Sequence, residues 1–201
     1  MAIKFQYNKT YLQQLNRELK IRLNALPTLK AKESALRFEV KKAKDALKVL
    51  QNEIENKKKN VEKEFRLWNE FPNELFKDIK INIVQKKIAG IRTPELGGVD
   101  FEIEEFSLFN NQSWIPDGIE IIKEMVSLTI KLKIYEERLK ILEFARRKTT
   151  QKVNLYEKVQ IPEYQEAIIK IKRFLEDEEN LSKASQKILK AKLVVNTGAV
   201  K

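Results

Sequence analysis

The sequence predicts a mainly α-helical fold: a long antiparallel coiled coil of two helices, joined by a small middle segment that contains a β-hairpin. Three observations support this. Apolar residues repeat with a helical period in both end regions, whereas the region between them alternates with the period of a strand. Seven of the ten prolines and glycines lie between residues 70 and 118.

We therefore divide the chain into four parts. Residues 1–69 form the N-terminal helix of the coiled coil, and residues 70–116 form the compact middle segment with the hairpin. Residues 117–192 form the C-terminal helix, and residues 193–201 are expected to be a flexible tail.

The first helix shows one heptad register over more than seven repeats. Thirteen of the seventeen core positions are apolar, and a repeat of 3.5 residues sustained for this length is typical of a coiled coil. Asn8 or Thr10 is the expected N-cap. The core positions are Leu12, Leu15, Leu19, Arg22, Leu26, Leu29, Glu33, Leu36, Val40, Ala43, Leu47, Leu50, Ile54, Lys57, Val61, Glu64 and Trp68.

The second helix is expected to begin after Asp117, a good N-cap, and to contain a proline. Its apolar seam shifts by one residue across Pro162, a residue that lacks the N–H of an interior helical position. The seam consists of Ile121, Met125, Leu128, Leu132, Tyr135, Leu139, Leu142, Arg146, Thr149, Val153 and Tyr156, and then Tyr164, Ile168, Ile171 and Leu175.

The middle segment has two stretches with strand periodicity. Ile79, Ile81 and Ile83 alternate with other residues in the first stretch, and Phe101 lies in the second. Residues 86–98 between them are expected to turn the chain. A lone hairpin is marginal in water, so its apolar face and edge should meet the coiled coil or a partner.

Two long helices joined by a compact reversal must run antiparallel. Pairing residue 69 with about residue 117 places Pro27 and Pro162 within roughly one turn of each other on opposite helices. Kinks at the same height would bend the whole rod. The alternative, that each proline is a tolerated surface kink, remains equally open.

Composition narrows the functional classes. The chain carries a net charge of +11 and contains neither Cys nor His, which removes the usual zinc, iron–sulfur and thiol chemistry. We expect no cofactor, no metal site and no catalytic residue: Gly97 and Gly98 lack a P-loop context, and Ser, Thr and Lys have no His partner. No apolar run is long enough to span a bilayer, and no secretory signal is expected.

The basic excess lies on the expected coiled coil. Residues 1–69 carry 17 basic and 8 acidic groups and residues 117–201 carry 18 and 13, whereas residues 70–116 carry 5 and 8. A phosphate backbone, an acidic lipid surface or an acidic protein cavity would each suit such a charge. Polar residues at core positions, such as Arg22 and Arg146, are expected to fix the register.

Three stretches resemble one protein family, the D subunit of V/A-type ATPases, in its bacterial form. The first runs from Arg146 and Arg147 through Pro162 to Glu176 and is similar to the family's C-terminal signature. The second, residues 88–94, contains Ile88, Ala89, Gly90, Ile91 and Pro94 and resembles a Val-Ala-Gly-Val-x-x-Pro segment. The third is the N-terminal "NKTYLQQLNRELK". The family's Arg/Lys-Gly-rich stretch is replaced here by "IRLNALPTLK".

The resemblance implies a central rotor shaft. Such a shaft stands inside a ring of catalytic A and non-catalytic B subunits, on the cytoplasmic face of the membrane. It binds the small F subunit of the central stalk and rests on the C (or d) subunit of the rotor base. Partner-binding residues implied by the matched motifs and the middle-segment aromatics are Ile88, Gly90, Ile91, Phe101, Phe106, Trp114, Arg146, Arg147 and Pro162.

Two other classes remain as alternatives. A non-rotary coiled-coil tether or nucleic-acid-binding rod is compatible with the composition, although no base-stacking aromatics lie among the basic clusters. The γ shaft of F-type synthases is a second rival, but residues 70–116 are too few for the Rossmann-like domain that surrounds its coil.

Overall fold

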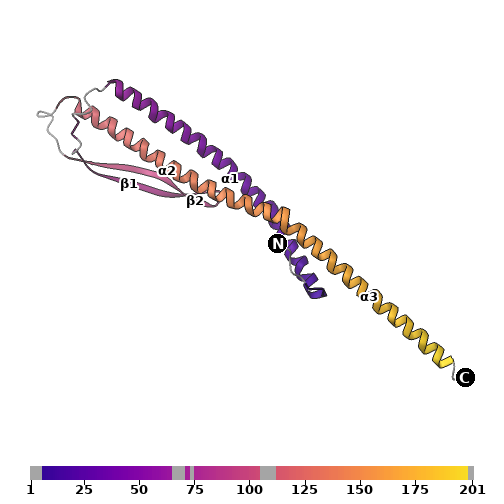
Figure 1. Cartoon of the computed structure of the whole chain (residues 1–201). Helices are drawn as coiled ribbons and strands as arrows, with labels where there is room; N and C mark the ends of the chain where they lie inside the picture. The colour runs from indigo at the N-terminus through magenta and orange to yellow at the C-terminus, as the bar shows by residue number, and fades with distance from the viewer. Residues whose placement is uncertain (1–5, 65–70, 73–74, 105–111, 199–201) are drawn as a thin grey trace. The chain divides into compact units, whose positions relative to one another are not determined.

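The structure is a computed structural model that describes residues 6–64, 71–72, 75–104 and 112–198 (Figure 1). The fold class predicted from the sequence is confirmed: long helices with a two-stranded antiparallel hairpin between them. The elements are α1 (Lys9–Glu64), β1 (Phe76–Ile88), β2 (Ile91–Ile103), α2 (Ile115–Asn154), the π-helix η3 (Leu155–Gln160) and α3 (Ile161–Gly198).

The chain divides into two compact units, which we describe separately. Unit 1 comprises Met1–Ala31 and Thr150–Lys201, and unit 2 comprises Lys32–Thr149. Unit 1 therefore contains the start of α1 together with η3 and α3, whereas unit 2 contains the rest of α1, the hairpin and nearly all of α2.

The start of α1 is fixed by a side-chain cap. The Asn8 side-chain oxygen accepts a hydrogen bond from the Tyr11 backbone N–H at 2.6 Å. This is the N-cap geometry in which a polar side chain satisfies one of the free amides of the first turn. Of the two expected caps, Asn8 is therefore the one used.

The core of unit 1 lies between the first turns of α1 and the first turns of α3. Leu15 from α1 packs with Tyr164, Ala167, Ile168 and Ile171 from α3, and Leu12, Leu19 and Leu175 lie around this cluster. All of these residues except Ala167 were expected at core positions of the two seams. Antiparallel pairing is confirmed here, because the early residues of α1 meet the residues that follow Pro162.

The core of unit 2 continues the same heptad register. Leu36, Val40 and Ala43 of α1 form a buried cluster with Leu142 of α2. Two ion pairs also join these helices: Lys44 Nζ lies 2.7 Å from Glu143 Oε1, and Lys57 Nζ lies 2.7 Å from Glu124 Oε2. The partner numbers fall along α2 as they rise along α1, so this part of the helix pair is also antiparallel.

The hairpin is longer and its turn tighter than the sequence indicated. Only Ala89 and Gly90 lie between the strands, with φ angles of 48° and 81°. Two successive residues with positive φ form a type I′ turn, whose twist suits a two-residue hairpin connection. Residues 86–98, expected to turn the chain, are therefore mostly strand, with Ile88 paired to Ile91 and Lys86 paired to Thr93.

Gly97 occupies a position in the middle of the hairpin that has no room for a side chain. The register shifts between Asn82 and Ile83, so that Gly97 is an extra residue on β2. A Cβ atom added to Gly97 would lie 2.9 Å from Val84 Cγ2 and 3.3 Å from the Asn82 carbonyl oxygen. This bulge thus needs glycine because the neighbouring strand approaches too closely for a side chain.

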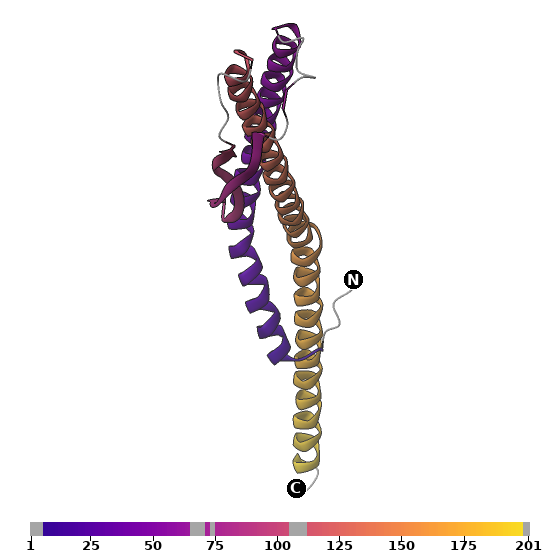
Figure 2. The same cartoon turned by 90° about the vertical axis from the view of Figure 1, so that its left-hand side faces the viewer.

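Both ends of the hairpin pack on the helices of unit 2. At the turn, Ile88, Ala89 and Ile91 lie against the cluster of Leu36 and Leu142. At the open end, Phe76 and Ile103 lie against a second buried cluster formed by Phe71, Ile115 and Ile119. The hairpin therefore packs on the helices of unit 2 at both ends and runs back along α2 (Figure 1), and Figure 2 shows it nearly end-on beside α1 and α2.

Two element boundaries differ from those expected. Helix α2 begins at Ile115, so Asp117 is an acidic residue of the first turn and not the N-cap. Pro116 also falls in this turn, where a missing N–H leaves no helical hydrogen bond unmade. At the other end, α3 continues to Gly198, into the segment 193–201 for which a flexible tail was expected.

Candidate partner-binding surfaces

The hairpin-turn residues singled out from the sequence are packing residues. Ile88 and Ile91 lie half-buried against the core of unit 2, and they are a directly paired couple across the hairpin. Gly90 supplies the positive φ of the turn, and a Cβ atom there would meet open space. These three residues thus position the hairpin, and of the three only Gly90 is exposed.

The aromatic residues of the middle segment gather at the open end of the hairpin. The Phe101 ring lies edge-on to Phe76 at 6.3 Å, and the Trp114 ring lies 6.0 Å from Phe71. Both Phe71 and Phe76 pack at the cluster formed with Ile115. Phe106, the other aromatic predicted to bind a partner, lies outside the described residues.

Arg146 and Arg147 differ sharply in environment. Arg146 occupies the seam, and its Nε atom is buried without a hydrogen-bond partner in the described part of the chain. The Arg147 side chain is exposed and lies 4.0 Å from Glu143, one turn away. Arg147 is therefore the one of the pair whose charge is displayed on the surface.

Pro162 does not interrupt the helix, because a π-helix absorbs it. The Ile161 N–H donates to the Tyr156 carbonyl, a spacing of five residues in place of four. The core-facing residues show the same spacing of five: half-buried Tyr156 is followed by buried Ile161, and buried Tyr164 comes next. The one-residue shift of the apolar seam across Pro162, read from the sequence, is thus confirmed and has a structural cause.

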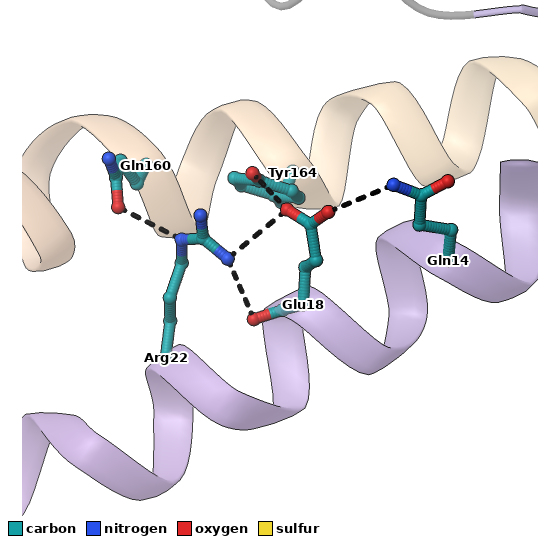
Figure 3. A network of polar contacts seen from close by, with 5 residues as sticks. All are labelled: Gln14, Glu18, Arg22, Gln160 and Tyr164. Atoms are coloured by element: carbon teal, nitrogen blue, oxygen red, sulfur yellow. Dashed lines mark hydrogen bonds and ion pairs between the residues drawn. The ribbon is translucent and has the colours of Figure 1, made fainter.

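A polar network of five residues lies next to η3 (Figure 3). The sequence predicted only that Arg22 and Tyr164 occupy seam positions. The Tyr164 hydroxyl donates to Glu18 Oε2 at 2.6 Å, and Gln14 Nε2 donates to Glu18 Oε1 at 3.2 Å. Arg22 Nε donates to Gln160 Oε1 at 2.9 Å, and the guanidinium lies 4.3 Å from the centre of the Tyr164 ring. The network links α1 to both η3 and α3 inside unit 1.

The network shifts the pKa values of its two titratable acids apart. The hydrogen bond from the Tyr164 hydroxyl, followed by that from Gln14 and the Arg22 charge, lowers the pKa of Glu18 below its usual 4.5. Burial, and then the hydrogen bond to Glu18, raises the pKa of Tyr164 above its usual 10.0. The Tyr164 hydroxyl therefore remains a donor and Glu18 an ionised acceptor across the neutral range.

Strand β1 carries the exposed apolar surface of the hairpin, and the sequence did not show which strand would carry it. Every residue from 77 to 87 is exposed, whereas β2 is exposed at only a few positions. The exposed fractions of Ile79, Ile81, Ile83 and Val84 are 36%, 45%, 52% and 51%. Their alternation was recognised in the sequence, but not that β2 would take the inner place and leave β1 outside.

The described residues contain neither a metal-binding cluster nor a membrane-spanning helix. Among residues 6–64, 71–72, 75–104 and 112–198 no group of three or more His, Cys, Asp or Glu side chains is placed to hold a metal ion. Within those ranges the helices also lack a stretch that is both long and apolar enough to cross a membrane.

Comparisons with known proteins agree with one another. The family of the ATP synthase D subunit matches residues 11–191. The D subunit of the V-type ATP synthase of Borreliella burgdorferi (strain B31) is 32% identical over 194 residues, which cover 95% of this chain and 96% of that protein. The protein of the same name from Chlamydia muridarum is 32% identical over 173 residues, covering 84% of this chain and 85% of the relative.

Proposed function

The chain belongs to the ATP synthase D-subunit family, and we propose that it is the central-stalk rotor subunit of a V-type rotary ATPase. In this role it transmits torque between the catalytic hexamer and the ion-translocating ring in the membrane. The observation that carries the proposal is the family match from residue 11 to residue 191, because it includes both strands and most of every helix.

The lateral links between helices support a torque-bearing role. In unit 1, α1 is tied to η3 by the Lys30–Glu157 ion pair at 2.6 Å and to α3 by the Tyr164–Glu18 hydrogen bond. In unit 2, α1 is tied to α2 by a buried apolar cluster and by the Lys44–Glu143 ion pair. Two helices joined in this way resist twisting better than one, because rotation of either must break contacts with the other.

We assign each partner subunit to one part of the chain's surface. The basic helix pair stands inside the ring of catalytic A and non-catalytic B subunits. The residues around the hairpin contact the F subunit of the central stalk and the C (or d) subunit of the rotor base. The complex is peripheral to the cytoplasmic face of the membrane at this level of the stalk. Nucleotide chemistry belongs to the large subunits, and the proposal gives this chain no catalytic group.

The π-helix supports a role for Pro162 in the asymmetry of the shaft. Only one helix of the pair in unit 1 contains η3, so the two helices of that unit differ in local geometry at one height. An asymmetric shaft can hold three catalytic sites in different states at the same moment. Pro162 itself is exposed and stands on the first turn after η3.

Co-purification tests the proposal. The tagged full chain, co-expressed with the two large ATPase subunits of its own organism, should be recovered with them in a stoichiometric complex. A core-disrupting variant, Leu142→Asp, serves as the control, because it should lose the complex through unfolding. Absence of the large subunits from preparations of the folded chain would contradict the proposal, and tight, steeply salt-dependent DNA binding would favour the nucleic-acid-binding rod.

A further inference from the structure

The outer edge of the hairpin is a preformed strand-pairing surface. The described sheet contains two strands in the order β1–β2, so the side of β1 that faces away from β2 pairs with no described strand. We call this side, over residues 77–87, the β1 edge. Phe76 and Ile88 at the two ends of β1 are packed on the helices, and this anchoring holds the exposed residues between them in extended form.

The register shows which backbone groups of β1 point outward. The type I′ turn is closed by the hydrogen-bonded pair Ile88 and Ile91, so the next pair, Lys87 with Arg92, is non-hydrogen-bonded, and pairs alternate from there. Gln85 pairs with Pro94 in a non-hydrogen-bonded position. Pro94 confirms this counting, because a residue without an N–H is tolerated where no ladder bond is needed.

We propose that the β1 edge binds an extended, acidic strand of another subunit of the ATPase, which adds a third strand to the hairpin. This inference rests on the proposed function. Outward N–H and C=O groups of Gln85 and Lys87 require an extended backbone as their partner, and strand addition at a free edge is a common mode of recognition. The exposed Ile79, Ile81 and Ile83 give the added strand apolar side chains to cover.

Charge defines the chemistry of the partner strand. β1 carries four lysines and one aspartate, whereas β2 carries three acids and one arginine. Lys77, Lys80 and Lys86 already lie against Glu104, Glu102 and Glu95, but Lys87 makes no ion pair with any described residue. An incoming strand with Asp or Glu opposite Lys87 would complete the pairing, whereas a basic strand would be repelled.

Lysines on an edge strand also discourage aggregation. Protection against aggregation explains the lysines, but it does not explain the exposed apolar side chains beside them. These are Ile79, Ile81, Ile83 and Val84. The rigid anchoring of both ends lowers the entropy that a strand must lose when it binds here. A partner strand therefore explains more of the observations than edge protection alone.

Amide hydrogen exchange at residue resolution tests the proposal in the full chain and in the assembled complex. In the free chain the ladder amides of Lys86 and Ile88 should exchange slowly and those of Gln85 and Lys87 quickly. In the complex the amides of Gln85 and Lys87 should slow by about tenfold or more, as expected when each gains a hydrogen bond. Assembly without this slowing would overturn the strand-pairing proposal and leave the proposed function intact.

Matched variants separate backbone pairing from side-chain contact. Gln85→Pro removes an outward N–H, and we expect it to weaken assembly about tenfold, whereas Gln85→Ala should change it less than about twofold. Lys87→Glu should weaken assembly at low salt, with a smaller effect at high salt. Equal binding by the Pro and Ala variants would overturn the proposal, as would slow exchange in the free chain that depends on its own concentration, because a second copy would then cover the edge.

Discussion

The two units hold a pair of helices together with different chemistry. In unit 1 an apolar cluster around Leu15 is bordered by a polar network in which Tyr164, Glu18 and Arg22 bond across the pair. In unit 2 the apolar cluster around Leu142 is covered by the hairpin turn, through Ile88 and Ile91. Directional bonds thus set the register in unit 1, whereas apolar cover from a third element stabilises unit 2.

The difference has a local cause. Unit 1 contains the π-helix, where successive core-facing residues are five positions apart. If the contacts between the two helices were purely apolar, the helices could pair around this irregularity in more than one register. Hydrogen bonds of fixed geometry permit one register only, and Arg22 bonds directly to Gln160, the last residue of η3. The described part of unit 2 contains no π-helix and needs no such restriction, so apolar cover from the hairpin turn serves its helices instead.

The largest expected effect comes from the core of unit 2. Leu142→Ala removes a side chain that is 0% exposed and should lower the free energy of unfolding by about 2–5 kcal/mol, because burial is lost and a cavity remains. Urea unfolding of the full chain, followed by circular dichroism, measures this change. If the units unfold separately, the transition assigned to unit 2 should move and that of unit 1 should remain.

A surface leucine gives the matched control for that experiment. Leu181 lies in α3 and is 70% exposed, so Leu181→Ala should change the free energy of unfolding by no more than about 0.5 kcal/mol. Equal losses from Leu142→Ala and Leu181→Ala would contradict the position of the unit 2 core.

A smaller effect is expected from the polar network of unit 1. Tyr164→Phe removes the hydrogen bond to Glu18 and should lower the free energy of unfolding by about 1 kcal/mol, a modest value because Glu18 is partly exposed and screened by solvent. The same substitution in the context of Glu18→Gln should cost less, since the charge-assisted bond is already lost. Non-additivity of the two variants in urea unfolding measures the coupling.

The pH dependence of that loss provides an independent check. Because the folded-state pKa of Glu18 is depressed, its contribution is present above the usual carboxyl pKa of 4.5 and disappears as the pH falls through the folded-state pKa. The difference in stability between the native chain and Tyr164→Phe should therefore be constant near neutral pH and shrink in strong acid. A difference that stays the same in strong acid would show that Tyr164 acts through packing alone.

A small gain in stability is expected at Pro162. In an ordinary helix an interior proline costs about 3 kcal/mol, but η3 already accommodates this one, so Pro162→Ala should stabilise the chain by only about 1 kcal/mol or less. If the local asymmetry serves rotation, the same variant should lower ATP hydrolysis by the assembled complex. A variant with raised stability and native turnover would leave Pro162 as a tolerated surface residue.

Much of the helix pair could be predicted because coiled-coil packing is encoded locally. Leu15, Leu36, Val40, Leu50 and Ile54, all assigned to core positions by heptad counting, are buried. Asn8 was recognised as a cap for the same reason, since the first turn of a helix depends on residues close in sequence. Periodicity thus determines these contacts without information from distant parts of the chain.

The hairpin was harder to predict, because its details depend on contacts between distant segments. Residues 86–98 contain Gly90, Pro94, Gly97 and Gly98, and such a composition is typical of a loop. In the structure all four lie in the hairpin: Gly90 forms the turn, Pro94 is in a non-hydrogen-bonded pair, Gly97 forms the bulge and Gly98 pairs with Asn82. Deletion of residues 86–98 would uncover the cluster around Leu142, because this segment contains Ile88, Ala89 and Ile91.

The candidate partner-binding residues show the same limit. The sequence identified Ile88, Ile91 and Phe101, but whether such residues face a partner or the chain itself depends on which strand lies inside. Since Thr93 of β2 is buried and Glu95 forms an ion pair with Arg138 of α2 at 3.8 Å, β2 is the inner strand and the exposed apolar residues belong to β1. No local pattern distinguishes the inner strand from the outer one when both alternate.

The π-helix also bears on how the length of this helix pair can vary. A π turn is an α-helix with one residue too many, so η3 holds a single-residue insertion while the faces before and after it keep their neighbours. A chain shorter by one residue between Val153 and Ile161 could run as regular α-helix and still present Val153 and Tyr164 to the first helix. Insertions and deletions of one residue, which elsewhere in a coiled coil would rotate every later side chain off the seam, are thus tolerable at this one place.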